Sequence, residues 1–406
     1  MEMKSGYKTT KVGVIPDNWN ISTLSALSRE PMQNGVFFKP SLKGSGVRLI
    51  NVGDLYNSAP IDSDTLELFD ATEKERERFK VEDGDLFFTR SSVVPSGIAH
   101  CNIYRAPRRE AVVFDSHVIR MRPDIRKVDP SYLFRFCVAS VARHYLISNA
   151  KTATMTTIDQ GVLGKCPVIL PPIAEQKAIV EALSDADTLI ASLEQLITKK
   201  RQIKQGAMQE LLTGKRRLPG FSGEWEVRTL KDAMNCLDNL RVPLNESQRN
   251  QMRGDYPYCG ANGVLDFVND YVIDEDILLI AEDGGYFDEY AYRPIAYRMT
   301  GKCWVNNHAH ILKAKEGFDQ GFLYYSLVHK NILSFLASGT RAKLNKSEMW
   351  KIEIFVPLAL SEQTAIATIL SDMDCEIAAL EANLTKTRFL KQGMMHNLLT
   401  GRIRLL

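Results

Sequence analysis

The sequence predicts an α+β protein in which two mixed α/β domains, related by an internal duplication, are separated by two long helices that pair as an antiparallel coiled coil. Three features indicate this architecture: a long internal repeat, a regular spacing of apolar residues within it, and short strand-like runs outside it. The chain of 406 residues is long enough for more than one domain. Its 45% hydrophobic and 25% charged residues are typical of globular proteins.

The repeat is the main evidence for a duplication. Residues 175–218 align without a gap to residues 362–405, and 25 of these 44 positions are identical. Weaker matches occur in the same order in both halves, among them Trp19 with Trp225 and His117 with His310, and we expect these four residues to be structural. The order of matches predicts globular domains at residues 1–170 and 219–357 and long helices at residues 171–218 and 358–406.

The repeated segments have the pattern of paired helices. Their apolar residues recur in alternating steps of four and three, which is the spacing of a coiled-coil seam. Prolines precede both segments, and Gly214 and Gly401 follow Leu-Leu-Thr as expected for C-caps. A two-fold duplication favours antiparallel pairing. The helices either serve for packing alone or also dock another protein. The predicted seam comprises Ile179, Leu183, Ala186, Ile190, Leu193, Ile197, Ile366, Leu370, Met373, Ile377, Leu380 and Leu384.

The two globular segments have mixed strand and helix patterns. Short runs rich in branched and aromatic residues predict strands, and glycine-rich and aspartate-rich turns surround them. Apolar runs that follow the strands predict short helices over residues 130–147 and 319–336. The predicted strands lie at residues 47–52, 85–89, 117–121, 277–280 and 310–313.

No motif in the sequence indicates catalysis or a metal site. The chain has no Asn/Asp-Pro-Pro-aromatic methyltransferase motif, no phosphate-binding loop and no zinc-binding pattern. Glu175-Gln176-Lys177 has the spacing of a nuclease Glu-x-Lys, but its repeat ends in Thr364, so we interpret the pair as a helix-start feature. His308 and His310 alternate along a strand-like run, and structural roles are expected for both. We therefore predict no catalytic residue and no bound metal.

Cysteine usage and charge give weaker indications. The seven cysteines are scattered and the N-terminus has no signal-peptide pattern, which favours reduced thiols and a cytoplasmic location. The net charge is only +2. Residues 1–171 have 23 basic and 19 acidic side chains, whereas residues 224–360 have 15 and 19. The acidic second domain counts mildly against DNA binding, although surface potential depends on where the charges lie.

Several motifs together resemble one family. Both repeated segments contain Glu-Gln, Lys-Gln-Gly-x-Met and Leu-Leu-Thr-Gly at matching positions. DGDLFFTRSS (83–92), WVNNHAHILKAK (304–315), SGTRAKLN (338–345) and the two W-x-x-x-T-L openings add to this pattern. The arrangement resembles the specificity subunit of type I restriction–modification systems over essentially the whole chain.

The resemblance implies a function. Each globular domain would be a target-recognition domain that reads one half of a split DNA site, and the helix pair would set the distance between the halves. Two modification subunits would supply the adenine methyltransferase and its S-adenosylmethionine. Restriction subunits would join for cleavage, so that S-adenosylmethionine, ATP and Mg are expected on partner subunits and no cofactor on this chain. The different side chains of the two domains imply an asymmetric target.

Polar residues on predicted loops and strand ends are the DNA-binding candidates, because Arg, Asn and Gln suit base readout and loops concentrate recognition residues. The candidates are Arg48, Asn51, Arg90, Ser91, Ser92, Lys151, Thr152, Thr154, Asn262, Asn306, Asn307, Thr340, Arg341, Lys343 and Asn345. Two other functions remain open at this stage. One is a coiled-coil scaffold that assembles proteins without binding DNA, and the other is a self-sufficient nuclease or methyltransferase, which the missing motifs disfavour.

Overall fold

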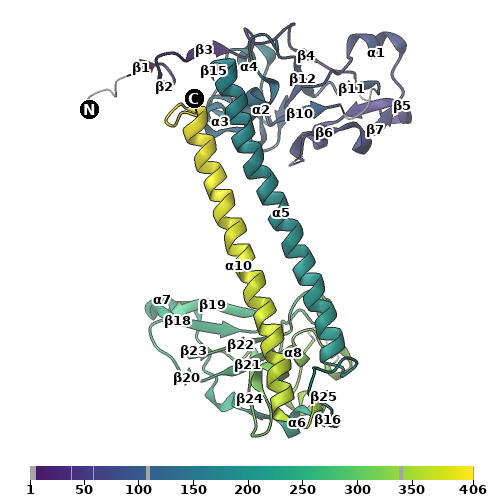
Figure 1. Ribbon diagram of the computed structural model, residues 1–406, viewed down its shortest axis with the longest axis vertical. Coiled ribbons are helices and arrows are strands. Elements are labelled where there is room, and N and C mark those ends of the chain that lie inside the picture. The colour runs from purple at the N-terminus through teal and green to yellow at the C-terminus, as the bar shows by residue number, and fades with distance from the viewer. Residues whose placement is uncertain (1–5, 38, 58, 107–109, 338–341, 406) are drawn as a thin grey trace. The chain divides into compact units, whose positions relative to one another are not determined.

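The computed structural model describes residues 6–37, 39–57, 59–106, 110–337 and 342–405. The chain divides into two compact units, one made of residues 1–192 and 384–406 and the other of residues 193–383. Both boundaries fall inside the long helices α5 (Ile173–Leu211) and α10 (Leu360–Leu399). Each unit thus contains a globular domain together with parts of both helices (Figure 1).

The first unit is built on a five-stranded mixed sheet of order β4-β12-β8-β10-β6. Its inner strand β8 is buried along its whole length because hydrophobic segments cover both faces of the sheet. The strands of this sheet are β4 (Gln33–Asn34), β6 (Ile61–Asp62), β8 (Leu86–Thr89), β10 (Cys101–Arg105) and β12 (Val118–Met121).

Smaller sheets and short helices complete this unit. A three-stranded sheet has the order β11-β5-β7, another has the order β13-β14-β9, and two pairs are β1-β2 and β15-β3. These strands are β1 (Tyr7–Thr10), β2 (Gly13–Pro16), β3 (Asn20–Thr23), β5 (Lys43–Ile50), β7 (Glu67–Phe69), β9 (Ser91–Ser92), β11 (Val112–Phe114), β13 (Lys151–Thr152), β14 (Thr156–Thr157) and β15 (Pro167–Leu170). The helices are α1 (Glu73–Arg78), α2 (Pro130–Val138), α3 (Ser140–Ser148) and α4 (Gln160–Gly164).

The second unit repeats this plan with fewer strands. Its two four-stranded sheets have the orders β17-β24-β21-β22 and β19-β18-β23-β20, and β16 pairs with β25. Its strands are β16 (Trp225–Thr229), β17 (Met234–Cys236), β18 (Arg253–Gly260), β19 (Gly263–Val268), β20 (Ile273–Asp274), β21 (Ile277–Ala281), β22 (Ala296–Met299), β23 (Lys302–Val305), β24 (Ala309–Ala314) and β25 (Glu353–Pro357). Its short helices are α6 (Leu230–Ala233), α7 (Glu246–Gln251), α8 (Gln320–Leu327) and α9 (Lys346–Met349).

Two predicted helices differ from the structure. The helix expected over residues 130–147 is interrupted at Ala139, which has an extended backbone, so that α2 and α3 pack separately into one core. The helix expected over residues 319–336 ends at Leu327, and a short 3-10 turn follows at Leu333–Phe335. Burial of Phe136, Leu146 and Ile332 decides these breaks, because tertiary packing overrides local propensity.

Each domain is closed by a strand pair directly before its long helix. In the first unit β3 pairs antiparallel with β15, and α5 begins three residues after β15 ends. In the second unit β16 pairs antiparallel with β25, and α10 begins three residues after β25 ends. The first and last parts of each domain therefore lie together at the N-terminus of the long helix that follows the domain.

The long helices pair antiparallel within each unit, as the sequence predicts. In the first unit Lys391 on α10 forms an ion pair with Asp187 on α5 at 2.5 Å. In the second unit Lys200 and Lys204 on α5 pair with Glu376 and Asp374 on α10. All twelve predicted seam residues are buried or half-buried, and none is exposed.

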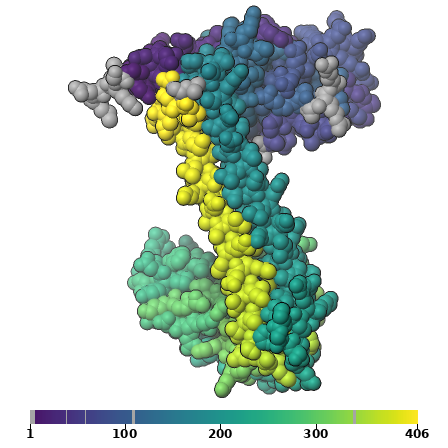
Figure 2. Space-filling model, in the orientation of Figure 1, coloured from purple at the N-terminus to yellow at the C-terminus, as the bar shows by residue number. Residues whose placement is uncertain are grey.

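The end of α10 packs into the first unit. The Tyr7 hydroxyl of the β1–β2 hairpin donates a hydrogen bond to the Gly401 carbonyl at 3.1 Å, and the end of α10 with the residues that follow it lies beside the N-terminal strands (Figure 2). Gly401 has a positive φ of 71°, and a Cβ there would meet Pro16 at 2.4 Å. Glycine is therefore required at this C-cap both for its backbone conformation and for its close packing. Among the residues described, no helix is long and apolar enough to cross a membrane.

Candidate nucleic-acid interface

The Glu-Gln pair at the start of each long helix attaches that helix to its domain. The Gln176 amide donates to the Pro171 carbonyl at 2.8 Å, and its oxygen accepts the Asp129 N–H at the start of α2. Gln363 makes the equivalent bonds to the Pro357 carbonyl and the Asp319 N–H, both at 2.9 Å. Buried amides with both ends bonded hold two elements in one orientation.

The glutamate of each pair is neutralised by an arginine that follows the other long helix. Arg217 donates to both oxygens of Glu362 at 2.6 and 2.7 Å. Arg404, at the same repeat position, donates to both oxygens of Glu175 at 2.5 and 2.8 Å. Both glutamates are 1% exposed. These two-point pairs make the Glu-Gln segment a structural anchor, in agreement with the interpretation of the Glu-x-Lys spacing as a helix-start feature.

Both domains contain the same short loop before a central strand, residues 115–117 in the first domain and 306–308 in the second, which we call the histidine loop. Its position corrects one match made from sequence. The His117 carbonyl accepts the Arg90 N–H at 2.9 Å, and the His308 carbonyl accepts the Glu282 N–H at 2.8 Å. Each histidine N–H donates to an Asp or Asn side chain two residues earlier, Asp115 in one domain and Asn306 in the other. The structural counterpart of His117 is therefore His308, not His310. The sequence signal was the shared Asp/Asn-x-His spacing, which the match to the following strand obscured.

In the first domain the histidine loop borders a groove of about 410 Å³. Strand β9 pairs with β14, which pairs with β13, so that Arg90 and Ser91 come close to Lys151. Arg90 and Lys151 are exposed and have no side-chain partner among the residues described. The groove is lined by Arg90, Ser91, His117, Asn149, Lys151, Thr157, Ile158, Asp159 and Val162. Three predicted DNA-binding residues, Arg90, Ser91 and Lys151, thus come together.

In the second domain the histidine loop borders a groove of about 500 Å³. Helix α7 provides one wall, and Asn245 begins it with a capping box to Gln248. The Arg249 guanidinium donates to Asp266 and to the Leu244 carbonyl, which orients it beside the groove. The groove is lined by Pro243, Leu244, Asn245, Gln248, Arg249, Tyr258, Leu265, Asn306, Asn307 and His308.

Two of the DNA-binding candidates chosen from sequence, Asn306 and Asn307, line this second groove, but sequence reasoning missed Asn245, Gln248 and Arg249. The Asn-x-x-Gln spacing of 245–248 is a helix-start signal that could have located the wall. Its position opposite the histidine loop follows from the pairing of β18 with β19 and β23, which no local pattern shows.

The other candidates of the first domain lie outside its groove or serve the fold. The Arg48 guanidinium donates to the Leu66 carbonyl at 2.8 Å, and Asn51 caps a 3-10 helix. Ser92 is buried, and its hydroxyl accepts the Val94 N–H. Thr152 and Thr154 are exposed near the β13–β14 turn.

The candidates of the second domain are also divided. Asn306 is 4% exposed and its amide oxygen holds the His308 N–H, so it shapes the loop, whereas Asn307 is exposed. Asn262 donates to the Gly284 carbonyl, and Lys343 forms an ion pair with Glu282 at 2.9 Å. Asn345 is exposed at the start of α9. Thr340 and Arg341 lie outside the described residues.

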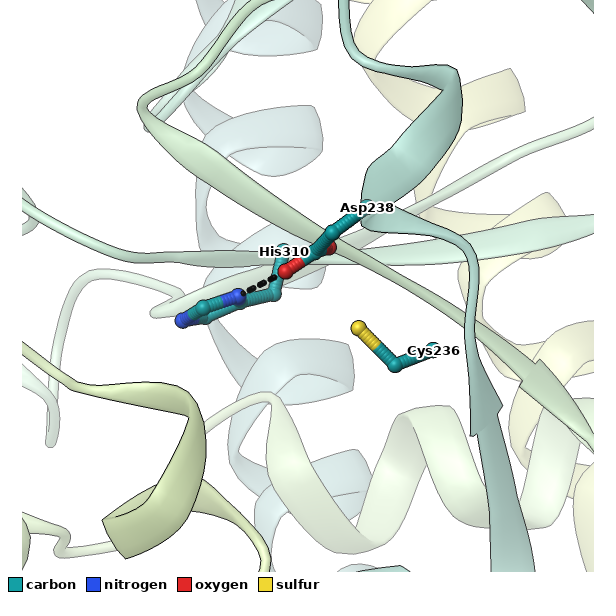
Figure 3. Close-up of side chains that lie close together, drawn as sticks. All are labelled: Cys236, Asp238 and His310. Atoms are coloured by element: carbon teal, nitrogen blue, oxygen red, sulfur yellow. Dashed lines mark hydrogen bonds and ion pairs between the residues drawn. The ribbon is translucent and has the colours of Figure 1, made fainter.

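His310 is the centre of a buried hydrogen-bonded cluster. Cys236, Asp238 and His310 place ligand-type atoms within 4.8 Å of one another (Figure 3). The His310 Nδ1–H donates to Asp238 at 2.7 Å, and Nε2–H donates to the Leu344 carbonyl at 2.9 Å. Burial alone lowers the pKa of His310, but hydrogen bonds to Asp238, Cys236 and Leu344 raise it to about 9. An imidazolium with both nitrogens engaged has no lone pair for a metal ion.

This cluster attaches a loop next to the second groove. Burial raises the pKa of Asp238, but the bonds from His310 and the Ile311 N–H lower it to about 2. The charged pair therefore ties β24 to the segment that contains Asp238, and the Nε2–H bond ties it to the segment that contains Lys343 and Leu344. The expectation that His310 is structural agrees with this geometry, whereas the His117 side chain is 61% exposed at its groove.

Comparison with known proteins identifies the family. The model of the type I restriction modification DNA specificity domain matches residues 16–205 and again residues 222–387. The chain belongs to this family. The resemblance inferred from sequence is thereby confirmed, and the two matches coincide with the two halves of the duplication.

Individual relatives agree with this assignment. A putative type I restriction enzyme specificity subunit of Methanocaldococcus jannaschii is 25% identical over 99% of this chain and 97% of its own length. A putative specificity subunit of Haemophilus influenzae is 38% identical over 154 residues, 38% of each chain. The crystal structure of a type I restriction–modification S subunit from M. genitalium matches 94% of this chain and 96% of its own, with a TM-score of 0.59 and 15% identity. This structural match supports the fold described above for this chain.

Proposed function

We propose that this chain is the sequence-reading subunit of a type I restriction–modification complex and has no catalytic site of its own. Each domain reads one half of a bipartite, asymmetric DNA site. The helix pair sets the spacing between the halves and docks two modification subunits. S-adenosylmethionine, ATP and Mg are bound by partner subunits and not by this chain.

One observation carries the proposal: the two domains have the same backbone framework around the histidine loop but different side chains on it and in the grooves beside it. Arg90 and Glu282 occupy the same backbone position, since each N–H donates to the groove histidine. Their carbonyls accept the equivalent Ile158 and Leu344 N–H groups. A common framework with changed side chains is what two different base sequences require, because base edges are distinguished by the donors and acceptors that face them.

The charged and polar groups of the grooves support nucleic acid as the ligand. Arg90 and Lys151 are exposed cations at the first groove, and Asn307 and Gln248 are polar groups at the second. The antiparallel helix pair supports a spacer role, because ion pairs and buried leucines resist sliding of one helix past the other. Two readers on one face of a duplex need such a fixed separation.

The test is genome-wide mapping of methylated adenines in cells with and without this chain. We expect a bipartite, non-palindromic motif that disappears with the gene. R90A should change or weaken recognition in one half only, whereas N307A should affect the other half. K215A, an exposed control outside both grooves, should leave the motif unchanged.

A coiled-coil scaffold that assembles partners without touching DNA is the contrary outcome. The acidic second domain is the observation in its favour, with 19 acidic against 15 basic residues over 224–360. A filter-binding assay of the chain with its modification partner discriminates, because phosphate contacts are strongest at low salt. If the complex retains no duplex at low salt, the scaffold function is supported and the DNA-recognition function is excluded.

A further inference from the structure

We propose that His117 and His308 are equivalent phosphate-contacting residues, one in each domain, which bind the DNA backbone through Nε2–H of a protonated imidazole. The inference rests on the proposed DNA-reading function and adds the residues that anchor each domain to its half-site irrespective of base sequence. The carrying observation is that both domains hold a histidine in the same loop at the edge of a groove.

Both histidine rings are oriented by a carboxylate. The His117 Nδ1–H donates to Asp115 at 2.8 Å, and the His308 Nδ1–H donates to Asp283 at 2.7 Å. Nε2 of each ring has no partner among the residues described, and the side chains are 61% and 45% exposed. With Nδ1–H held by the carboxylate, a protonated ring presents Nε2–H as its outward donor.

The two carboxylates have different origins. Asp115 lies two residues before His117, and its Oδ1 accepts both the histidine N–H and the ring Nδ1–H. In the second domain Asn306 accepts the backbone N–H, and the ring turns to Asp283, which follows β21. In both domains a carboxylate thus fixes the orientation of the histidine ring, although the carboxylate comes from different positions in the chain. A solvated surface histidine needs no such restraint, whereas a contact residue benefits from a fixed ring.

Phosphate is the DNA group that fits a shared donor. Residues that differ between the two domains suit base readout, and a residue common to both suits the backbone, which is the same in every sequence. A charged N–H donor is also strongest towards an anionic oxygen. The charged or titratable groups around His117 are Asp115, Arg90, Lys151 and Asp159. Those around His308 are Asp283, Glu282, Lys343, Arg241, Arg249 and Tyr258.

The experiment measures binding of the complex between this chain and its modification partner to duplexes that contain or lack the mapped site. H117A and H308A should each weaken binding by about tenfold on both duplexes, with an unchanged preference between them. H117Q should restore most of the affinity, because a glutamine amide supplies an N–H donor at the place of Nε2. The salt dependence of binding should decrease by about one phosphate contact in each alanine variant.

A pH series separates a protonated contact from a packing role. Wild-type affinity should fall as the pH is raised, because deprotonation removes the Nε2–H donor, and H117Q should lose this histidine's contribution. D115N, which copies the natural Asn306, keeps an acceptor for the backbone N–H and should weaken the contact of the ring. H144A, an exposed histidine on α3 outside the groove, is the matched control and should bind normally.

The outcomes are distinct from those of the proposed function. If the wild-type complex binds and methylates its site but H117A and H308A keep full affinity and salt dependence, the phosphate contact is excluded. The proposed DNA-recognition function is then unaffected. A changed base preference in these variants would also overturn the phosphate contact in favour of base readout. If the wild-type complex binds no duplex, the proposed function itself fails.

Discussion

Arg404 binds Glu175 through both carboxylate oxygens, and it joins the segment after α10 to the first turn of α5. The guanidinium also lies over the Trp19 ring, with 5.6 Å between its central carbon and the ring centroid. Arg217 and Glu362 repeat this relationship in the second unit, where the arginine lies 5.7 Å from the Trp225 ring. The residues that follow α10 thus contact the domain that precedes α5. The internal repeat explains why the Arg404–Glu175 and Arg217–Glu362 contacts have the same geometry.

Removing either arginine should destabilise its own unit. R404A and R217A each leave a buried carboxylate without its charged partner, and we expect a loss of about 3 kcal/mol in the free energy of unfolding. Urea denaturation followed by circular dichroism measures the loss. R402A, at an exposed position in the same segment, is the control and should change stability by less than about 0.5 kcal/mol. Equal effects of R404A and R402A would show that the Arg404–Glu175 ion pair does not stabilise the first unit.

The two tryptophans should respond differently to the same substitution. The Trp19 Nε1–H donates to Glu175 at 2.9 Å, whereas Nε1 of Trp225 is buried and has no hydrogen-bond partner in the part of the chain that the structure describes. Both W19F and W225F remove similar volume, but only W19F removes a bond to a charged group. We expect W19F to cost about 1.5 kcal/mol more than W225F in unfolding free energy. Equal losses in urea melts would show that this hydrogen bond contributes nothing.

The His310–Asp238 pair should make the second unit sensitive to alkaline pH. The pKa of His310 is raised to about 9, above the ordinary value of 6.5, so its stabilisation is complete below about pH 6.5 and is lost as pH rises through 9. The difference in unfolding free energy between wild type and H310Q should therefore shrink from pH 6 to pH 10. Urea melts at each pH measure it, with H329Q, an exposed histidine, as control. A difference that stays constant across this range would contradict the charged pair.

The helix seam should depend on its buried leucines at equivalent repeat positions. Leu183 on α5 and Leu370 on α10 are both 0% exposed, each in its own unit. L183A and L370A should each cost about 3 kcal/mol, because truncation leaves a cavity. L189A, at a position that is 50% exposed on α5, should cost less than about 1 kcal/mol. Thermal unfolding compares the three, and a larger loss for L189A would show that the seam lies on another face.

Much of the architecture was predictable because it depends on local periodicity. The four-three spacing of Ile179, Leu183 and their repeats defines one apolar stripe per helix, and each stripe must be buried against a partner. Alternating and continuous apolar runs also located β8, β12, β21 and β24 to within a few residues. The helix breaks at Ala139 and after Leu327 were missed, since they follow from packing on the sheets.

The groove residues were only partly predictable. Arg90, Ser91 and Lys151 were chosen as polar loop residues, and strand pairing brings them together. Ser92 and Asn306 were chosen on the same ground, yet they face inward and hold backbone N–H groups. Polarity and loop position do not tell which way a side chain faces, because a one-residue step along a strand end reverses it.

By itself, the sequence determined the duplication, the two long paired helices and the family, because each depends on apolar spacing, short motifs and their repetition along the chain. Tertiary structure alone decided that His117 corresponds to His308, that His310 is a buried cation, and that α7 forms the second groove's wall. Those relationships join residues distant in the chain. Their geometry is set by strand register and burial, which depend on the free energy of the whole domain rather than on any local segment.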